Sequence, residues 1–229
     1  MNHMKPLISI LLAVFLLASC NNANQQNNTS APTDTTKTDS IPTETTKRIL
    51  FFGNSLTAGL GLQDQSLAFP ALIQQKIDSL KLPYTCINAG LSGETSAGGK
   101  DRIDWLLKDK VDVFVLELGA NDGLRGISTE STYQNLNEIV NKVKKAYPDC
   151  KLVLAGMMVP PSMGEKYFND FAAIFPKLAK EQNMTLVPFL LDKVAGIQNL
   201  NQNDGVHPTK EGQEILANNV WQHLKSIVQ

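Results

Sequence analysis

The sequence has few cysteines and no excess of charge of either sign, and these two shortages exclude several classes of protein. Only Cys20, Cys86 and Cys150 occur among 229 residues, without a CxxC pair. We therefore expect neither a metal cage nor a disulfide framework, and no cofactor. The formal net charge is −1 and no basic run is present. The sequence thus lacks the electrostatic signature of a nucleic-acid-binding protein.

The sequence also lacks an apolar run long enough to span a bilayer at its start. The run Leu7–Ala18 follows a lysine, and a membrane-spanning helix needs about 20 such residues. A short apolar core followed by small residues is typical of a secretory signal. Its ending, LASC at Cys20, resembles a bacterial lipoprotein box, which implies cleavage before Cys20 and lipid attachment to its sulfur. A plain secretory signal with an incidental cysteine is the alternative.

The next stretch, residues 21–47, consists almost entirely of Asn, Gln, Thr, Ser, Asp, Lys and Pro. It has too little apolar surface to offset the entropy lost on ordering. We expect a signal peptide at 1–19, a lipidated cysteine and disordered tether at 20–47, and one globular, monomeric domain at 48–229. This organisation predicts a protein of the bacterial cell envelope, facing the periplasm or the exterior, that meets the membrane only through the lipid anchor at Cys20.

Strand-like and helix-like segments alternate through residues 48–229, which predicts an α/β fold. The segment VDVFVLEL at 111–118 is apolar nearly throughout, as expected for a central parallel strand covered on both faces. Such alternation indicates a doubly wound, mainly parallel sheet. Strands are expected at Arg48–Phe52, Tyr84–Asn88, Val111–Leu118, Lys151–Gly156 and Thr185–Leu190, and helices at Leu67–Leu80, Asp101–Lys108, Thr132–Tyr147, Asn169–Gln182 and Lys210–Val228.

Three polar, glycine-containing segments follow the first three expected strands, at residues 53–55, 88–95 and 119–123. The carboxyl ends of parallel strands lie at one edge of the sheet, where open α/β folds bind ligands. Each segment alone could be a turn, but together they predict a site. Ser55 follows a buried strand directly and is a candidate nucleophile; a serine that only caps a helix is the alternative.

A serine nucleophile needs a base, and histidine has the suitable pKa. His3 would leave with the signal peptide, and His223 fits a partly exposed structural role in the last helix. His207 lies in the segment DGVHP, where Asp204 can reach back to the imidazole and orient it. A solvated loop is the alternative interpretation of the Asp204–His207 pair.

Acyl transfer also requires donors aimed at the developing oxyanion. The backbone N–H groups of Ser55 and Gly93 and the side-chain amide of Asn121 are the candidates. Gly93 would let a substrate approach the backbone, and Asn121 would donate without adding charge. Glycine and asparagine also favour turns, which is the alternative for both.

Four blocks of the sequence together resemble the SGNH hydrolases, also called GDSL esterases/lipases: GNSL, NAGLSGET, ELGANDGLRG and DGVHP. The resemblance covers essentially all of residues 48–229. It implies a flavodoxin-like three-layer α/β/α sandwich with a five-stranded, mainly parallel sheet. It also implies that Ser55 is the nucleophile, His207 the base and Asp204 its orienting acid, with Ser55, Gly93 and Asn121 forming the oxyanion hole.

The segments LELGANDGLRG and FPKLAKE resemble the thioesterase I/lysophospholipase/arylesterase branch most closely. This resemblance implies small acyl esters or thioesters as substrates. A carbohydrate O-acetyl esterase and a non-catalytic binding module are the alternatives; the intact Ser55, Asp204 and His207 argue against the second. Acyl-chain preference is expected to depend on the loops Met157–Phe168 and Asp192–Asn203.

Two further expectations follow from the resemblance. The family's usual strand order, 2-1-3-4-5, sets Cys86 and Cys150 well apart, so we expect them to be unpaired. The residue before the nucleophile is usually Asp in the family and is Asn54 here. This difference removes a charge beside Ser55, and we expect it to change local hydrogen bonding without inactivating the protein.

Overall fold

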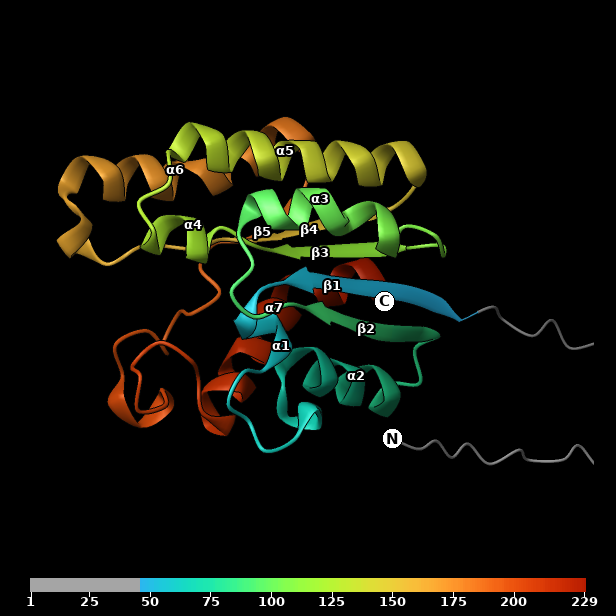
Figure 1. Ribbon diagram of the computed structural model, residues 1–229. Helices are drawn as coiled ribbons and strands as arrows, with labels where there is room; N and C mark the ends of the chain where they lie inside the picture. The colour runs from blue at the N-terminus through green and yellow to red at the C-terminus, as the bar shows by residue number, and fades with distance from the viewer. Residues whose placement is uncertain (1–45) are drawn as a thin grey trace, which may run out of the picture. The chain divides into compact units, whose positions relative to one another are not determined.

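The computed structural model describes residues 46–229. The expected signal peptide, Cys20 and nearly all of the expected tether lie outside the described residues. Strands and helices alternate through the described part, as predicted (Figure 1). The strands are β1 (Lys47–Gly53), β2 (Tyr84–Gly90), β3 (Val113–Glu117), β4 (Lys151–Ala155) and β5 (Thr185–Val187). The helices are α1 (Ser55–Ala58), α2 (Phe69–Ser79), α3 (Ser96–Leu106), α4 (Ala120–Leu124), α5 (Thr129–Ala146), α6 (Glu165–Gln182) and α7 (Lys210–Val228), with 3₁₀ turns η1 (Gln65–Leu67), η2 (Pro161–Met163) and η3 (Gln198–Leu200).

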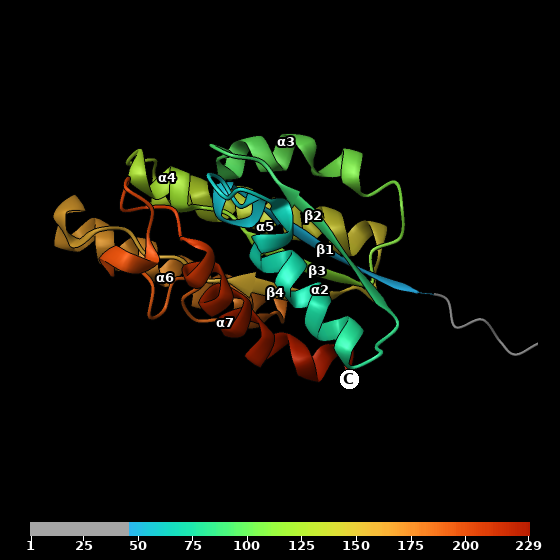
Figure 2. The same ribbon diagram turned by 90° about the horizontal axis from the view of Figure 1, so that it is seen from below.

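The five strands form one sheet in the order β2-β1-β3-β4-β5, and every neighbouring pair is parallel. Helices α3, α5 and α6 cover one face, and α2 and α7 cover the other (Figures 1 and 2). This is the predicted three-layer sandwich with the predicted strand order. The register places Gly53 opposite both Gly90 and Glu117. The carboxyl ends of β1, β2 and β3 are therefore level.

The core explains why β1 has no polar side chain after Arg48. Successive side chains of a strand point to opposite faces. Phe51 packs edge-on against Phe69 of α2, whereas Phe52 lies under the guanidinium of Arg102 on α3. Both phenylalanines are fully buried. A strand covered on both faces has to be apolar at every position, and this removes the period-2 pattern of a half-exposed strand.

Several element ends differ from the expected ones for local reasons. Helix α3 begins at Ser96, five residues earlier than expected, because Thr95 caps it by accepting the N–H of Gly98. The last strand ends at Val187, since the next residue, Pro188, has no N–H to offer a ladder. The short helices α1 and α4 were not expected. They are too short to show a helical period in the sequence.

The two cysteines within residues 46–229, Cys86 and Cys150, lie at different strands of the sheet. Cys86 is near the start of β2, at one edge, and Cys150 directly precedes β4. Neither is in a disulfide, which confirms that they are unpaired. Burial raises the pKa of both thiols to about 12, so both stay protonated at neutral pH.

The carboxyl ends of the strands point to the left in Figure 1, where α1, α4 and the long connection before α7 lie. Strand β1 enters the sheet from the opposite side. No helix within residues 46–229 is long and apolar enough to cross a membrane. The same residues contain no group of three or more His, Cys, Asp or Glu side chains arranged to hold a metal ion.

Candidate active site

Ser55 is the first residue of α1, directly after the sharp turn that follows β1, and it does not cap that helix. The cap is Asn54, whose Oδ1 accepts the N–H of Leu56 at 2.9 Å. The alternative of a capping serine is therefore wrong, and the Ser55 hydroxyl can bond elsewhere. The turn requires Gly53, because a Cβ there would lie 2.1 Å from Oγ1 of Thr57.

The structure brings Ser55, His207 and Asp204 into one hydrogen-bonded chain. Oγ of Ser55 lies 2.9 Å from Nε2 of His207, although the two residues are 152 positions apart. Nδ1 of His207 lies 2.6 Å from Oδ2 of Asp204. Since an ionised carboxylate only accepts hydrogen bonds, the Nδ1 hydrogen faces Asp204 and Nε2 is left to accept the Ser55 hydroxyl. This tautomer suits a base that removes a proton from Ser55.

Backbone contacts hold the loop that carries Asp204 and His207. Oδ1 of Asp204 accepts the N–H groups of Val206 at 2.9 Å and His207 at 3.0 Å. The carbonyl of His207 accepts the N–H of Gln202 at 2.7 Å. Gly205 permits the turn through its positive φ of 68°. The loop is therefore ordered by its own hydrogen bonds, although its surface is open to solvent.

The N–H of His207, its ring and the N–H of Val206 lower the pKa of Asp204 to about 2. These bonds all favour the charged form of the carboxyl group. Its side chain is 48% exposed, so water also solvates the charge. Asp204 is therefore ionised at any pH at which this protein is expected to work.

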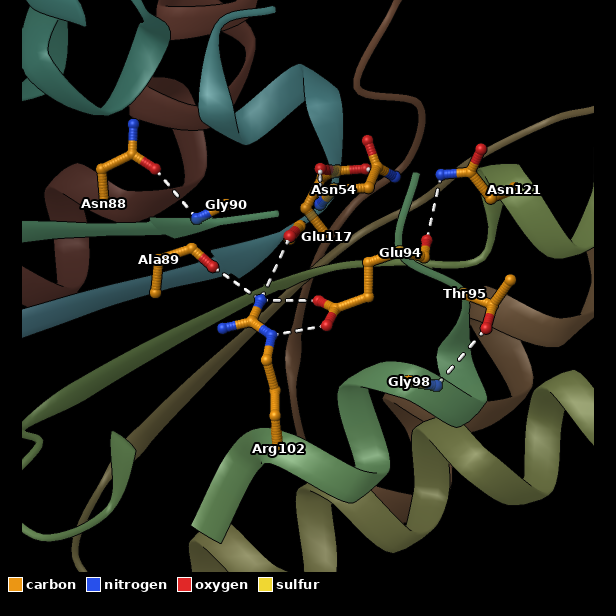
Figure 3. Close-up of polar contacts among 11 residues, drawn as sticks. Asn54, Asn88, Ala89, Gly90, Glu94, Thr95, Gly98, Arg102, Glu117 and Asn121 are labelled. Atoms are coloured by element: carbon orange, nitrogen blue, oxygen red, sulfur yellow. Dashed lines mark hydrogen bonds and ion pairs between the residues drawn. The ribbon is translucent and has the colours of Figure 1, made fainter. Parts of the chain in front are cut away.

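The two remaining oxyanion candidates are Gly93, after β2, and Asn121, after β3. Glu94 connects them, because it follows Gly93 in the chain and contacts Asn121. Gly93 has a φ of 80°, and the space where a Cβ would project is open. Nδ2 of Asn121, on α4, donates to the backbone carbonyl of Glu94 at 3.0 Å (Figure 3). Arg125 donates to the carbonyl of Gly93 at 3.1 Å. His223 is half-buried on α7, and it is not part of the chain formed by Ser55, His207 and Asp204.

Glu117 is an important residue of this region that the sequence analysis missed. It ends β3 and is only 1% exposed. Its Oε2 accepts the N–H of Asn54 at 3.1 Å and the hydroxyl of Thr57 at 2.8 Å, and its Oε1 accepts Nδ2 of Asn54 at 2.8 Å. Burial raises its pKa to about 7, against the opposing effect of these donors. A lone acid in the otherwise apolar end of VDVFVLEL was the available signal.

The contact with Glu117 shows what an asparagine at position 54 provides that an aspartate would not. Asn54 uses both ends of its amide: the oxygen caps α1 and the nitrogen donates to Glu117. An ionised aspartate there would have no hydrogen to donate and would face Glu117 as a second carboxyl group. The expected change in local hydrogen bonding therefore has a specific partner, Glu117, directly beneath the turn of Ser55.

A serine, a histidine and an aspartate joined in this way at the carboxyl edge of a parallel sheet are the arrangement of a serine hydrolase. The comparison with protein families agrees with that class. Residues 51–215 match the GDSL-like lipase/acylhydrolase family, and the chain belongs to this family of ester-cleaving hydrolases.

Named relatives match most of the domain. The chain is 38% identical over 181 residues to esterase TesA of Pseudomonas aeruginosa, covering 79% of this chain and 89% of the relative. It is also 38% identical to the thioesterase 1/protease 1/lysophospholipase L1 of Escherichia coli, covering 79% and 84%. Among solved structures, the psychrotrophic esterase EstA of Pseudoalteromonas, inhibited by monoethylphosphonate, is 34% identical with a TM-score of 0.74, covering 79% and 98%.

Proposed function

We propose that this chain hydrolyses carboxylic esters or thioesters through an acyl-enzyme formed on Ser55. The observation that carries the proposal is the 2.9 Å contact between Oγ of Ser55 and Nε2 of His207, which is continued by the 2.6 Å contact to Asp204. Relatives named esterase and thioesterase/lysophospholipase support the same reaction class.

In the first step, Oγ of Ser55 attacks the acyl carbon while its proton passes to Nε2 of His207. Asp204, held ionised by backbone N–H groups, stabilises the imidazolium that forms. His207 then gives the proton to the departing alkoxide or thiolate, and the acyl group remains on Ser55. Water activated by the same histidine releases the acid and restores the serine.

The negative charge on the acyl oxygen needs donors that are in place beforehand. The N–H groups of Ser55 and Gly93 and the side-chain amide of Asn121 fill this role in the proposal. An asparagine amide has two hydrogens. Glu94 accepts one of them at 3.0 Å, and the second is the donor for the oxyanion.

The rim of the site favours an apolar acyl or aryl group over a sugar acetate. Leu91, Leu124, Met158 and Val206 are all large and at least 44% exposed. Leu91 and Met158 lie in the loops after β2 and β4, Leu124 ends α4, and Val206 directly precedes His207. Leu91 is also bonded to the end of β1, because its N–H donates to the Gly53 carbonyl at 2.9 Å. Exposed apolar side chains in one region commonly mark a binding surface for apolar groups.

The test of the proposal is hydrolysis of p-nitrophenyl esters of increasing chain length, alongside acetylated sugars. We expect Ser55→Ala to abolish hydrolysis with an unchanged thermal midpoint, and a fluorophosphonate probe to label Ser55 in the wild type. Turnover preserved in Ser55→Ala, or labelling of Ser92 instead, would contradict the assignment. Rates highest on acetylated sugars would favour the carbohydrate esterase.

The proposed location is the cell envelope, with the domain anchored by lipid at Cys20. Its support is the sequence alone: LASC at the end of the apolar run, followed by a polar tract. A lipoprotein's several acyl chains would hold the protein stably, unlike a single chain. Cys20→Ser should therefore move the protein from the membrane to the soluble fraction. Unmodified Cys20 in soluble wild-type protein would contradict the anchor.

A further inference from the structure

The loop between β2 and α3 is mostly exposed, but it contains one deeply buried acid. Leu91, Ser92 and Gly93 are exposed, whereas the side chain of Glu94 is only 2% exposed. A buried carboxylate is costly unless it is paired and hydrogen-bonded. The partner of Glu94 is Arg102, eight residues further along, on α3.

Arg102 connects this loop to the ends of two strands. Its Nε and Nη2 donate to the two oxygens of Glu94 at 2.5 Å each (Figure 3). The same Nη2 donates to the carbonyl of Ala89 in β2 at 2.8 Å and approaches that of Gly53 at 3.5 Å. The guanidinium lies 4.2 Å from the ring centre of Phe52. A planar, forked donor suits this set of contacts better than an ammonium.

Glu94 in turn contacts both oxyanion candidates outside the Ser55 turn. Gly93 precedes it directly in the chain, so a shift of Glu94 moves the peptide of Gly93. The backbone carbonyl of Glu94 accepts a hydrogen bond from Nδ2 of Asn121 and thereby orients that amide (Figure 3). Arg102 therefore fixes the side chain of Glu94, and the backbone of Glu94 fixes the two oxyanion donors, Gly93 and Asn121.

We infer that Arg102 and Glu94 are positioning residues that hold Gly93 and Asn121 at the oxyanion. The inference rests on the proposed function and extends it to two residues outside the Ser55–His207–Asp204 chain. Arg102 bonds to Glu94 and to strand carbonyls, and its contribution reaches the reaction through Gly93 and Asn121. Loss of the pair should weaken binding of the transition state more than binding of the ester, so kcat should fall while KM changes little.

The test compares Arg102→Met with a matched control, Lys142→Met, which removes a cation of α5 that is paired with the same helix, α3. Lys142 pairs with Asp104 of α3 at 2.8 Å, and its side chain is 27% exposed, against 25% for Arg102. Because a misplacement of about 1 Å can cost about 10² in rate, we expect Arg102→Met to lower kcat about 10- to 100-fold, with KM within about threefold. Lys142→Met should keep wild-type kcat.

Removing Arg102 leaves Glu94 buried without its partner, which could prevent folding. Arg102→Lys keeps the charge but cannot bond both Glu94 oxygens and Ala89 together. We expect it to fold, with a thermal midpoint near the wild type, and to lose about 3- to 10-fold in kcat because the forked geometry is lost. Wild-type kcat in folded Arg102→Lys and Arg102→Met would overturn the inference.

A double-mutant cycle with Asn121→Ala separates positioning from a general structural effect. If Arg102 acts partly through Asn121, its replacement should cost less in the Asn121→Ala background than in the wild type. Equal losses in both backgrounds would overturn the inference. Ser55→Ala is measured in the same assay: if it remains active, the proposed function fails, whereas Arg102 variants with full kcat beside an inactive Ser55→Ala refute only the positioning role.

Discussion

Two carboxylates adjoin the Ser55 turn, and the structure holds them in opposite ways. Asp204 is on an open loop and is 48% exposed, and hydrogen-bond donors lower its pKa to about 2. Glu117 ends a central strand and is 1% exposed, and burial raises its pKa to about 7 despite three donors. The comparison shows that a similar number of donors gives opposite results, because desolvation dominates only for the buried group.

The difference suits two tasks. In the proposed mechanism Asp204 must remain charged while His207 gains and loses a proton, so an exposed, hydrogen-bonded position serves it. Glu117 contacts Asn54 and Thr57 on either side of Ser55. It fixes the turn, and its charge state affects the stability of that turn.

The largest expected effect is loss of the base that Asp204 orients. His207→Ala should lower kcat/KM by about 10⁴-fold or more, since Ser55 then has no proton acceptor. The rate series with p-nitrophenyl esters measures it, with thermal unfolding as a check of the fold. His223→Ala is the control and should retain the wild-type rate. If His223→Ala were the inactive variant, the assignment of His207 would be wrong.

A smaller loss is expected when Asp204 is neutralised. Asp204→Asn removes the charge that stabilises the imidazolium and can favour the wrong tautomer, but it leaves the base in place. We expect a loss of about 10²- to 10⁴-fold in kcat, less than for His207→Ala. Because Asp204 is exposed, the thermal midpoint should hardly change. A fully active Asp204→Asn enzyme would show that the ring is oriented by other contacts.

The smallest expected effect concerns Glu117 and is one of stability. Its pKa is about 7 in the folded protein, against an ordinary value of 4.5 for a glutamate side chain. The folded state therefore binds more protons between these values, and the free energy of unfolding should fall as pH rises through that window. Asn54→Asp would add a second carboxylate at the 2.8 Å contact with Glu117. The two carboxyl groups, at positions 54 and 117, would share one proton up to a higher pH. The free energy of unfolding of this variant should therefore continue to fall above pH 7.

Thermal unfolding at about pH 5 and pH 8.5 measures this effect. One pKa unit corresponds to about 1.4 kcal/mol, so Asn54→Asp should lower the midpoint by about 3–6 °C at the higher pH and much less at the lower one. Ester hydrolysis by the folded variant should persist at neutral pH, because Ser55, His207 and Asp204 are unchanged. A midpoint that follows the wild type at both pH values would contradict the proton-sharing pair.

The exchanged variant Asn54→Asp with Glu117→Gln sharpens the same test. It keeps one carboxylate and one amide in reversed places, and the glutamine oxygen can still accept from Thr57 and from the N–H of residue 54. We expect it to recover the stability that Asn54→Asp loses at high pH. Glu117→Gln alone would set two amide nitrogens against each other and should be destabilised at both pH values.

The alternation of strands and helices could be predicted because it depends on local pattern. Apolar runs and helical periods are read within about ten residues, and they identified all five strands of the described sheet. The candidate residues Ser55, His207 and Asp204 could be named because serine hydrolases need these side chains, and the four family blocks give their positions. The short helices α1 and α4 could not be predicted, since four or five residues define no period.

The sequence by itself determined the class of fold and the candidate nucleophile, base and acid, and the family resemblance added the strand order that separates Cys86 from Cys150. Only the tertiary structure decided that Glu117 supports Asn54 and that Arg102 and Glu94 join the loops of Gly93 and Asn121. The physical reason is that these roles belong to contacts between segments up to 63 residues apart. Burial then decides whether the pKa of a carboxyl group is raised or lowered, and the identity of a residue alone does not reveal how deeply it is buried.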